Sequence, residues 1–278
     1  MKENEKDEIN CLDKGFVRLV DSMGNDSSIV QAARVSYGAG TKTKRQDREL
    51  IRYLMRHRHT SPFEMVEFKF HVKLPIFVAR QWIRHRTASV NEYSGRYSEM
   101  KDDFYIPEPE QIRTQSTYNR QARGDEHIAV DETNKILETL KNSQSKLFAE
   151  YQDFLSVHLA RELARINLPL ATYTEWYWKI DLHNLFHFLK LRLDPKAQYE
   201  IRVYGEAISQ LIKPIVPLAF EAFEDFILNS ISFSAQELSA LKNAISFEKL
   251  EEESLKSYGF GDREILEFKE KITVLKNK

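Results

Sequence analysis

Residues 66–86 read VEFKFHVKLPIFVARQWIRHR, and the spacing of the apolar residues changes within this stretch. Over residues 66–72 apolar and polar residues alternate, which predicts a strand with one buried face. Pro75 then suits the first turn of a helix over residues 76–86. The stretch therefore predicts a strand that passes directly into a helix.

The predicted helix ends in a polar stretch, RHRTASVNEYSGRY, over residues 84–97. Gln81, Arg84 and His85 are spaced i, i+3 and i+4, so they share one helix face. The stretch that follows has almost no large aliphatic residue to bury, and Ser94 and Gly95 favour a turn. Because arginine forms paired hydrogen bonds with phosphate, this region predicts a site for an anionic nucleotide.

Periodicity and turn signals predict further elements on both sides. Asp26, Ser27 or Ser28 can cap the first helix, and Asp181 can cap the helix over residues 182–192. The other predicted elements are strands at 16–20 and 170–180, helices at 28–36, 48–59, 132–166 with a break near 142–145, and 196–212, and a loop at 111–131.

These elements predict an α+β fold with a central, mostly antiparallel sheet flanked by helices. We expect three segments: a polar N-terminal tail at 1–13, a main domain at 14–228 and a helical C-terminal extension at 229–278. The extension contains short, highly charged amphipathic helices without an obvious polar site, which predicts a structural appendage.

Composition excludes some classes of protein. The 278 residues are 42% hydrophobic, and no apolar run approaches the roughly 18 residues that span a bilayer. The first ten residues are charged and lack a secretory signal, and Cys11 is the single cysteine, so we expect a cytoplasmic chain without disulfides. The net charge of −1 argues against bulk nucleic-acid binding.

Other kinds of site have weaker support. His183 and His187 have the i, i+4 spacing of helical zinc ligands, but Asn184 stands where a metalloprotease has glutamate, so we expect no metal. Cys11 has no histidine near it in sequence, which argues against a cysteine nucleophile. No glycine-rich dinucleotide or phosphate loop occurs. An arginine-rich nucleic-acid-binding module and a histidine-based metalloenzyme remain as alternatives.

The stretch over residues 84–97 resembles the RHRxxSxNExSxRY signature of the flavin-dependent thymidylate synthases at every specified position. The resemblance extends over about residues 14–220. It implies reductive methylation of dUMP to dTMP, with 5,10-methylenetetrahydrofolate as carbon donor, FAD as hydride carrier and NADPH as reductant. It also implies a homotetramer whose sites are shared between subunits.

The resemblance implies roles for individual residues. Arg192 is the expected catalytic residue, placed against the uracil. The expected dUMP contacts are Gln81, Arg84, Glu92, Tyr93, Ser94, Gly95, Arg96, Arg165 and Arg192. The expected FAD contacts are Ser36, His59, Ser61, Glu64, Arg84, His85, Arg86, Glu92, Asp181, His183 and His187. The chain departs from the family at Lys196, where many members have histidine, so a cofactor contact there is either replaced or lost.

Overall fold

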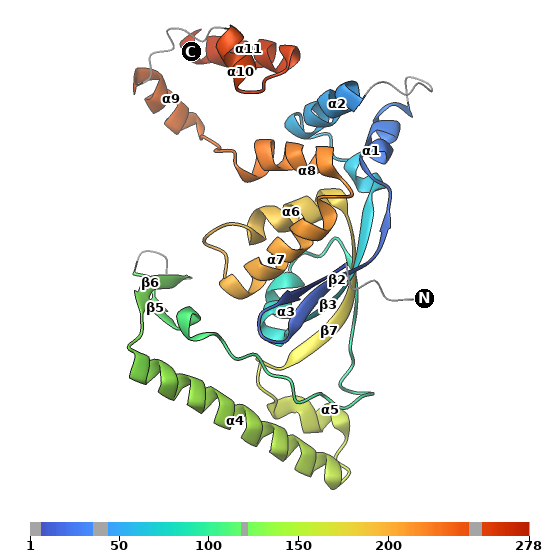
Figure 1. The fold of residues 1–278 in the computed structure, drawn as a ribbon, viewed down its shortest axis with the longest axis vertical. Helices are drawn as coiled ribbons and strands as arrows, with labels where there is room; N and C mark the ends of the chain where they lie inside the picture. The colour runs from blue at the N-terminus through green and yellow to red at the C-terminus, as the bar shows by residue number, and fades with distance from the viewer. Residues whose placement is uncertain (1–6, 36–43, 118–121, 245–251, 278) are drawn as a thin grey trace.

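The computed structural model describes residues 7–35, 44–117, 122–244 and 252–277. Its centre is a five-stranded sheet in the order β1-β2-β3-β7-β4, and every neighbouring pair is antiparallel (Figure 1). These strands are β1 (Glu8–Cys11), β2 (Gly15–Met23), β3 (Glu67–Pro75), β7 (Tyr173–Asp181) and β4 (Ser89–Glu92). The predicted α+β class is confirmed.

The pairing of β3 with β7 forms the middle of the sheet. The two strands match over nine positions, from Glu67 opposite Asp181 to Pro75 opposite Tyr173. On β3 the alternate side chains are fully buried, as the period of two predicts. The buried β3 residues are Phe68, Phe70, Val72 and Leu74.

Three helices pack against the buried side of this sheet, namely α3 (Ile76–Trp82), α6 (Leu182–Arg192) and α7 (Tyr199–Ile212). Trp82 of α3 is fully buried, and its ring centroid lies 5.6 Å from Trp176 and 5.1 Å from Trp178 of β7. Phe188 of α6 lies 4.8 Å from the same ring. This aromatic cluster fixes the end of α3 beside α6.

Three further helices lie at one end of the sheet: α1 (Asp26–Ala33), α2 (Lys44–Arg56) and α8 (Pro217–Phe223). Asn25, which precedes all three predicted candidates, is the N-cap of α1, because its side chain accepts a hydrogen bond from the Ser27 amide at 2.9 Å. Asp26 instead accepts hydrogen bonds from the amides of Leu218 and Ala219 at the start of α8. Asp26 therefore joins two helices.

The predicted polar tail is corrected by the structure, because Glu8–Cys11 forms the edge strand β1. Cys11 is 1% exposed, and burial raises the pKa of its thiol to about 12. Asp13 accepts a hydrogen bond from the Tyr173 hydroxyl at 2.6 Å. Four residues are too few to show a strand period, and backbone pairing with β2 determines their conformation.

The middle of the chain differs from its prediction at two places. Residues 111–131 are not all loop, because β5 (Arg113–Gln115) and β6 (Arg123–His127) form a hairpin. The helix α4 (Val130–Ser156) continues through the predicted break at 142–145, and the chain turns instead near His158, whose φ is 61°. Figure 1 shows α4 extending away from the sheet beside the short helix α5 (Arg161–Ala164).

The predicted C-terminal helices are present as α9 (Ala235–Ala244), α10 (Glu252–Ser257) and α11 (Asp262–Asn277). They lie at the opposite end of the molecule from α4 (Figure 1). Between α8 and α9 the chain forms a π-helical turn, η6 (Glu224–Leu228). Among the described residues, no helix is both long and apolar enough to cross a bilayer.

Candidate functional site

The polar end of α3 meets the end of α6 through a contact between His85 and Arg192. The Nε and Nη2 atoms of Arg192 lie 3.2 Å and 3.0 Å from His85 Nε2. The rings of His187 and Phe188 flank His85 at 5.8 Å and 4.9 Å between centroids. The two predicted residues, 107 positions apart, thus form one unit.

Electrostatics determine the proton positions in this unit. Burial, with smaller contributions from Arg192 and His187, lowers the pKa of His85 to about 4. His85 is therefore neutral near pH 7 and accepts the hydrogen of Arg192 at Nε2, which leaves its own hydrogen on Nδ1. Burial also lowers the pKa of Arg192, although a guanidinium stays charged at physiological pH. The result is a fixed positive charge with a neutral partner.

A second polar network begins at Gln81, also on α3. Its side-chain amide donates to Gln198, and Gln198 donates to Glu200 at 2.9 Å. Glu200 is 2% exposed and also accepts hydrogen bonds from Tyr105 at 3.0 Å and from Arg123. The buried carboxylate thus has three donors, which offset its desolvation. We call Gln81, His85, His187, Arg192 and Gln198 the helix cluster.

Ahead of the predicted turn at Ser94 and Gly95, Ser89–Glu92 forms the edge strand β4 against β7, which was not predicted from the sequence. Glu92 accepts a hydrogen bond from the Thr174 hydroxyl at 2.8 Å. The amide of Tyr93 continues the pairing, because it donates to the Glu175 carbonyl at 2.8 Å. The strand therefore holds the start of the following turn against the sheet.

That turn brings further predicted residues together. A Cβ at Gly95 would lie 3.2 Å from Arg165 Nη1 and 2.7 Å from Met100 Sδ, so Arg165 packs directly on the glycine. Arg96 extends outward, with Nη2 3.3 Å from Glu162 Oε2, and both side chains are more than half exposed. We call Glu92, Tyr93, Ser94, Gly95, Arg96 and Arg165 the loop cluster. Among the described residues, no direct hydrogen bond or ion pair joins it to the helix cluster.

A cavity of about 570 Å³ lies between the chain after α2, the outer side of α6 and the C-terminal segment. His59, His183 and His187, all predicted flavin contacts, line it. Its walls include the apolar side chains of Leu54, Met55, Phe63, Phe186, Phe226, Ile227 and Ile231. Its cationic lining residues are Arg56, Arg58, Lys190 and Lys271. A pocket that combines apolar walls with cationic side chains fits a flavin ring that carries a diphosphate.

The remaining predicted flavin contacts lie outside the lining of this cavity. Ser61 and Glu64 are exposed and share a turn, in which the Glu64 amide donates to the Ser61 carbonyl. Asp181 is the N-cap of α6, as predicted, because its carboxylate accepts from the Asn184 amide at 2.9 Å. Arg84 and Arg86 are exposed at the end of α3, Lys196 is exposed after α6, and Ser36 lies outside the described residues.

The sequence did not single out Gln198, Arg58 or Lys271. Gln198 lies two positions after Lys196, where the chain departs from its family, whereas Arg58 and Lys271 stand in charged stretches without a local pattern. Lys190 shares a helix face with His183 and His187, but no role was predicted for it. Within the described ranges no three His, Cys, Asp or Glu side chains form a group that could hold a metal ion.

The antiparallel sheet flanked by helices defines an α+β protein, and its arginine-bearing clusters and partly cationic cavity suit anionic ligands. The profile of a family described as thymidylate synthase complementing protein (Thy1) matches residues 18–218. The chain belongs to this family.

Similar proteins agree with that assignment. A flavin-dependent thymidylate synthase from Treponema denticola is 54% identical over 265 residues, covering 95% of this chain and 97% of that protein. One from Thermus thermophilus is 58% identical over 264 residues, covering 95% of each. A crystal structure of a UMP/dUMP methylase, PolB, from Streptomyces cacaoi bound with 5-Br dUMP has a TM-score of 0.72 and 34% identity, covering 80% of this chain and 100% of that one.

Proposed function

We propose that this chain methylates dUMP to dTMP as a flavin-dependent thymidylate synthase. The carbon comes from 5,10-methylenetetrahydrofolate, and FAD, reduced by NADPH, supplies the hydride. The names of the two relatives, at more than half identity over 95% of the chain, support the reaction and the flavin. PolB, a UMP/dUMP methylase bound with 5-Br dUMP, supports a uridine nucleotide as substrate.

The observation that carries the proposal is the fixed guanidinium of Arg192 beside neutral His85. A positive charge held against the uracil favours ionisation at N3, which increases electron density at C5, the carbon that is methylated. His85 accepts a hydrogen bond from Arg192 and so orients the guanidinium before substrate arrives. No cysteine nucleophile is required, and Cys11 is buried in β1.

The loop cluster binds the phosphate and sugar of dUMP in this proposal. Arg96 and Arg165 provide charge, and Ser94 with the turn at Gly95 provides hydrogen-bond donors close to them. Arg96 is held by an exposed ion pair with Glu162, which a phosphate can replace at low cost.

The assembly we propose is a homotetramer with sites shared between subunits. The helix cluster and the loop cluster each form within one chain, and the described residues show no direct polar contact between them, which supports completion of each site by a neighbouring chain. Light scattering on purified protein tests this, since a tetramer has about four times the chain mass of 32.7 kDa. A monomer that forms dTMP would contradict shared sites.

The reaction is tested by incubating purified chain with FAD, dUMP, methylenetetrahydrofolate and NADPH and measuring dTMP by chromatography. Omission of each component in turn is the control, and every omission should abolish dTMP formation. Consumption of NADPH without dTMP would leave only a flavin reductase. A parallel reaction with UMP tests the sugar specificity, because PolB is a methylase of both UMP and dUMP.

A further inference from the structure

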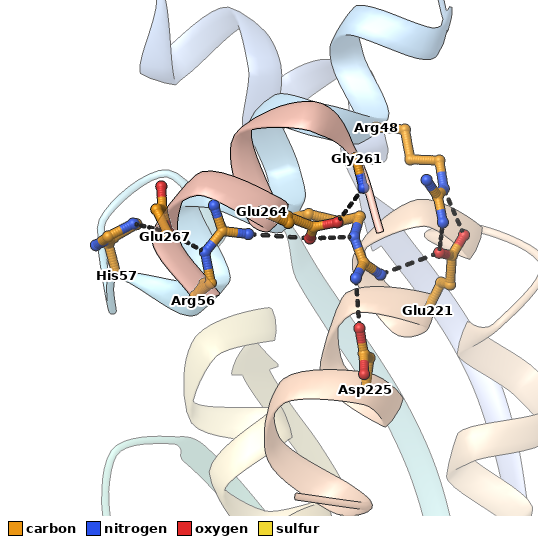
Figure 2. Close-up of polar contacts among 9 residues, drawn as sticks. Arg48, Arg56, His57, Glu221, Asp225, Gly261, Glu264 and Glu267 are labelled. Carbon is orange, nitrogen blue, oxygen red and sulfur yellow. Dashed lines mark hydrogen bonds and ion pairs between the residues drawn. The ribbon is translucent and has the colours of Figure 1, made fainter. Parts of the chain in front are cut away.

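The C-terminal helix α11 is attached to the catalytic body by buried ion pairs. Arg56 of α2 donates from Nε to Glu267 at 2.6 Å and from Nη1 to Glu264 at 3.0 Å (Figure 2). Arg52 donates from Nε to Glu264 at 2.8 Å. The Arg52, Arg56 and Glu264 side chains are about one-tenth exposed, so solvent screens these pairs weakly. We call these four residues the ionic clamp.

Other contacts strengthen the attachment. Arg52 also pairs with Asp225 and Glu221, and its guanidinium lies 4.6 Å from the ring centroid of Phe226. The hydrogen bond from Arg56 lowers the pKa of Glu267 to about 2, and His57 acts in the same direction. Ile265 of α11 is 1% exposed. These contacts hold α11 against α2.

The helix face that makes the clamp also presents Lys271 to the cavity lined by His59, His183 and His187. Glu264, Glu267 and Lys271 have i, i+3 and i+7 spacing, which places them along one face of α11. Lys271 lines the cavity together with Arg58, which follows α2, and Lys190 of α6. In the described part of the chain, none of these three side chains has an ion-pair or hydrogen-bond partner. Asp225, the single acidic side chain among the described lining residues, is paired with Arg52.

We propose that α11 completes the flavin site and that Lys271, with Arg58 and Lys190, binds the diphosphate of FAD. This inference rests on the proposed function. The three cations come from three separate segments, and the other Arg, Lys, Asp or Glu side chains among the described lining residues, Arg56 and Asp225, are already in ion pairs. A diphosphate carries the opposite charge and hydrogen-bond acceptors for all three.

The test measures the dissociation constants of FAD and riboflavin by fluorescence titration of flavin-free protein. Riboflavin has the same ring system without phosphate. Lys271→Ala should weaken FAD binding roughly ten-fold and leave riboflavin binding unchanged. A ten-fold loss is the lower end of the range for a charge-assisted hydrogen bond, because the site is partly exposed. Lys271→Arg should retain most of the affinity for FAD. The matched control is Lys141→Ala, an exposed lysine on α4, which should change neither ligand.

A second variant tests the role of the helix rather than of one charge. The double variant Glu264→Gln, Glu267→Gln breaks the ionic clamp without substituting any residue that lines the cavity. FAD should again bind about ten-fold more weakly, and adding Lys271→Ala should cause little further loss, since both changes remove the same contact. If α11 were not needed for FAD binding, the FAD affinity of this double variant would be unchanged. It could even be higher, because the broken clamp releases Arg56, which also lines the cavity.

The outcomes separate this inference from the proposed function. If the unaltered protein binds no FAD, the proposed function fails. If it binds FAD and Lys271→Ala binds it equally well, or if riboflavin and FAD weaken together, the inference alone is wrong.

Discussion

The helix cluster and the loop cluster both carry arginines expected at the nucleotide, but their surroundings differ. Arg192 in the helix cluster is half-buried and oriented by His85, which in turn packs against His187 and Phe188. Arg96 in the loop cluster has a side chain that is 58% exposed and an exposed acidic partner, Glu162. The first arginine is held by a half-buried partner, whereas the second is held only by an exposed ion pair. Under the proposed function, catalytic positioning and substrate capture would thus be separated in the fold.

The largest expected effect is that of Arg192→Ala. Loss of the preorganised charge should lower the rate of dTMP formation by about 10²–10³-fold, while FAD binding and the circular dichroism spectrum are retained. Arg192→Lys should recover part of the rate, because it restores the charge but not the planar fork. Turnover at the normal rate in the alanine variant would remove Arg192 from the catalytic role.

Arg165→Ala addresses the loop cluster. Its contact with the phosphate should be charge-assisted, so dUMP should bind about 10–100-fold more weakly, measured by calorimetry. FAD affinity is the internal control, and it should not change. Equal weakening of both ligands would show that the two clusters are not independent.

Gly95→Ala perturbs the same cluster without removing a charge. The added Cβ would lie 2.7 Å from Met100 Sδ and 3.2 Å from Arg165 Nη1, so both side chains must move. We expect about a five-fold loss in dUMP affinity, in line with a small overpacking cost. A parallel Gly261→Ala change meets no atom closer than 3.6 Å and should have no effect on dUMP affinity.

The smallest effect concerns the pH dependence of stability. The pKa of His85 is about 4 in the folded protein and about 6.5 in the unfolded chain, so the unfolded chain binds more protons between these values. His85 therefore makes the free energy of unfolding rise with pH from about 4 to 6.5, and above that range it adds no further increase. His85→Gln should reduce the rise by about 1 kcal/mol, allowing for solvent screening at a half-buried site. Urea denaturation at pH 4.5 and 7 measures it, and an unchanged rise would contradict the assignment.

Local pattern was sufficient where neighbours in sequence are also neighbours in space. The predicted strand at 66–72, the start of a helix after Pro75 and the Asp181 cap follow from period and capping, and the structure has them as β3, α3 and the N-cap of α6. The helix was predicted too long, because α3 ends at Trp82 and Arg84, His85 and Arg86 follow it. Family and fold class are confirmed as well. The individual dUMP and FAD contacts, the co-substrates and the tetramer stay predictions.

Long-range contacts could not be read from local pattern. His85 meets Arg192 across 107 positions, and Arg52 meets Glu264 across 212. Nothing near either residue in sequence encodes the partner, because side-chain spacing carries information over a few turns of helix at most. The edge strand β1 was missed for a related reason, since its conformation depends on pairing with β2.

The burial of Cys11 has a practical consequence for measuring α11. The chain has a single cysteine, its thiol is 1% exposed, and its raised pKa leaves almost no thiolate near neutral pH. Maleimide dyes should therefore not react with the native protein. A pair of cysteines introduced on the exposed sides of α11 and α4 would be labelled without background, and energy transfer between the dyes would report how far the C-terminal helix moves when flavin binds.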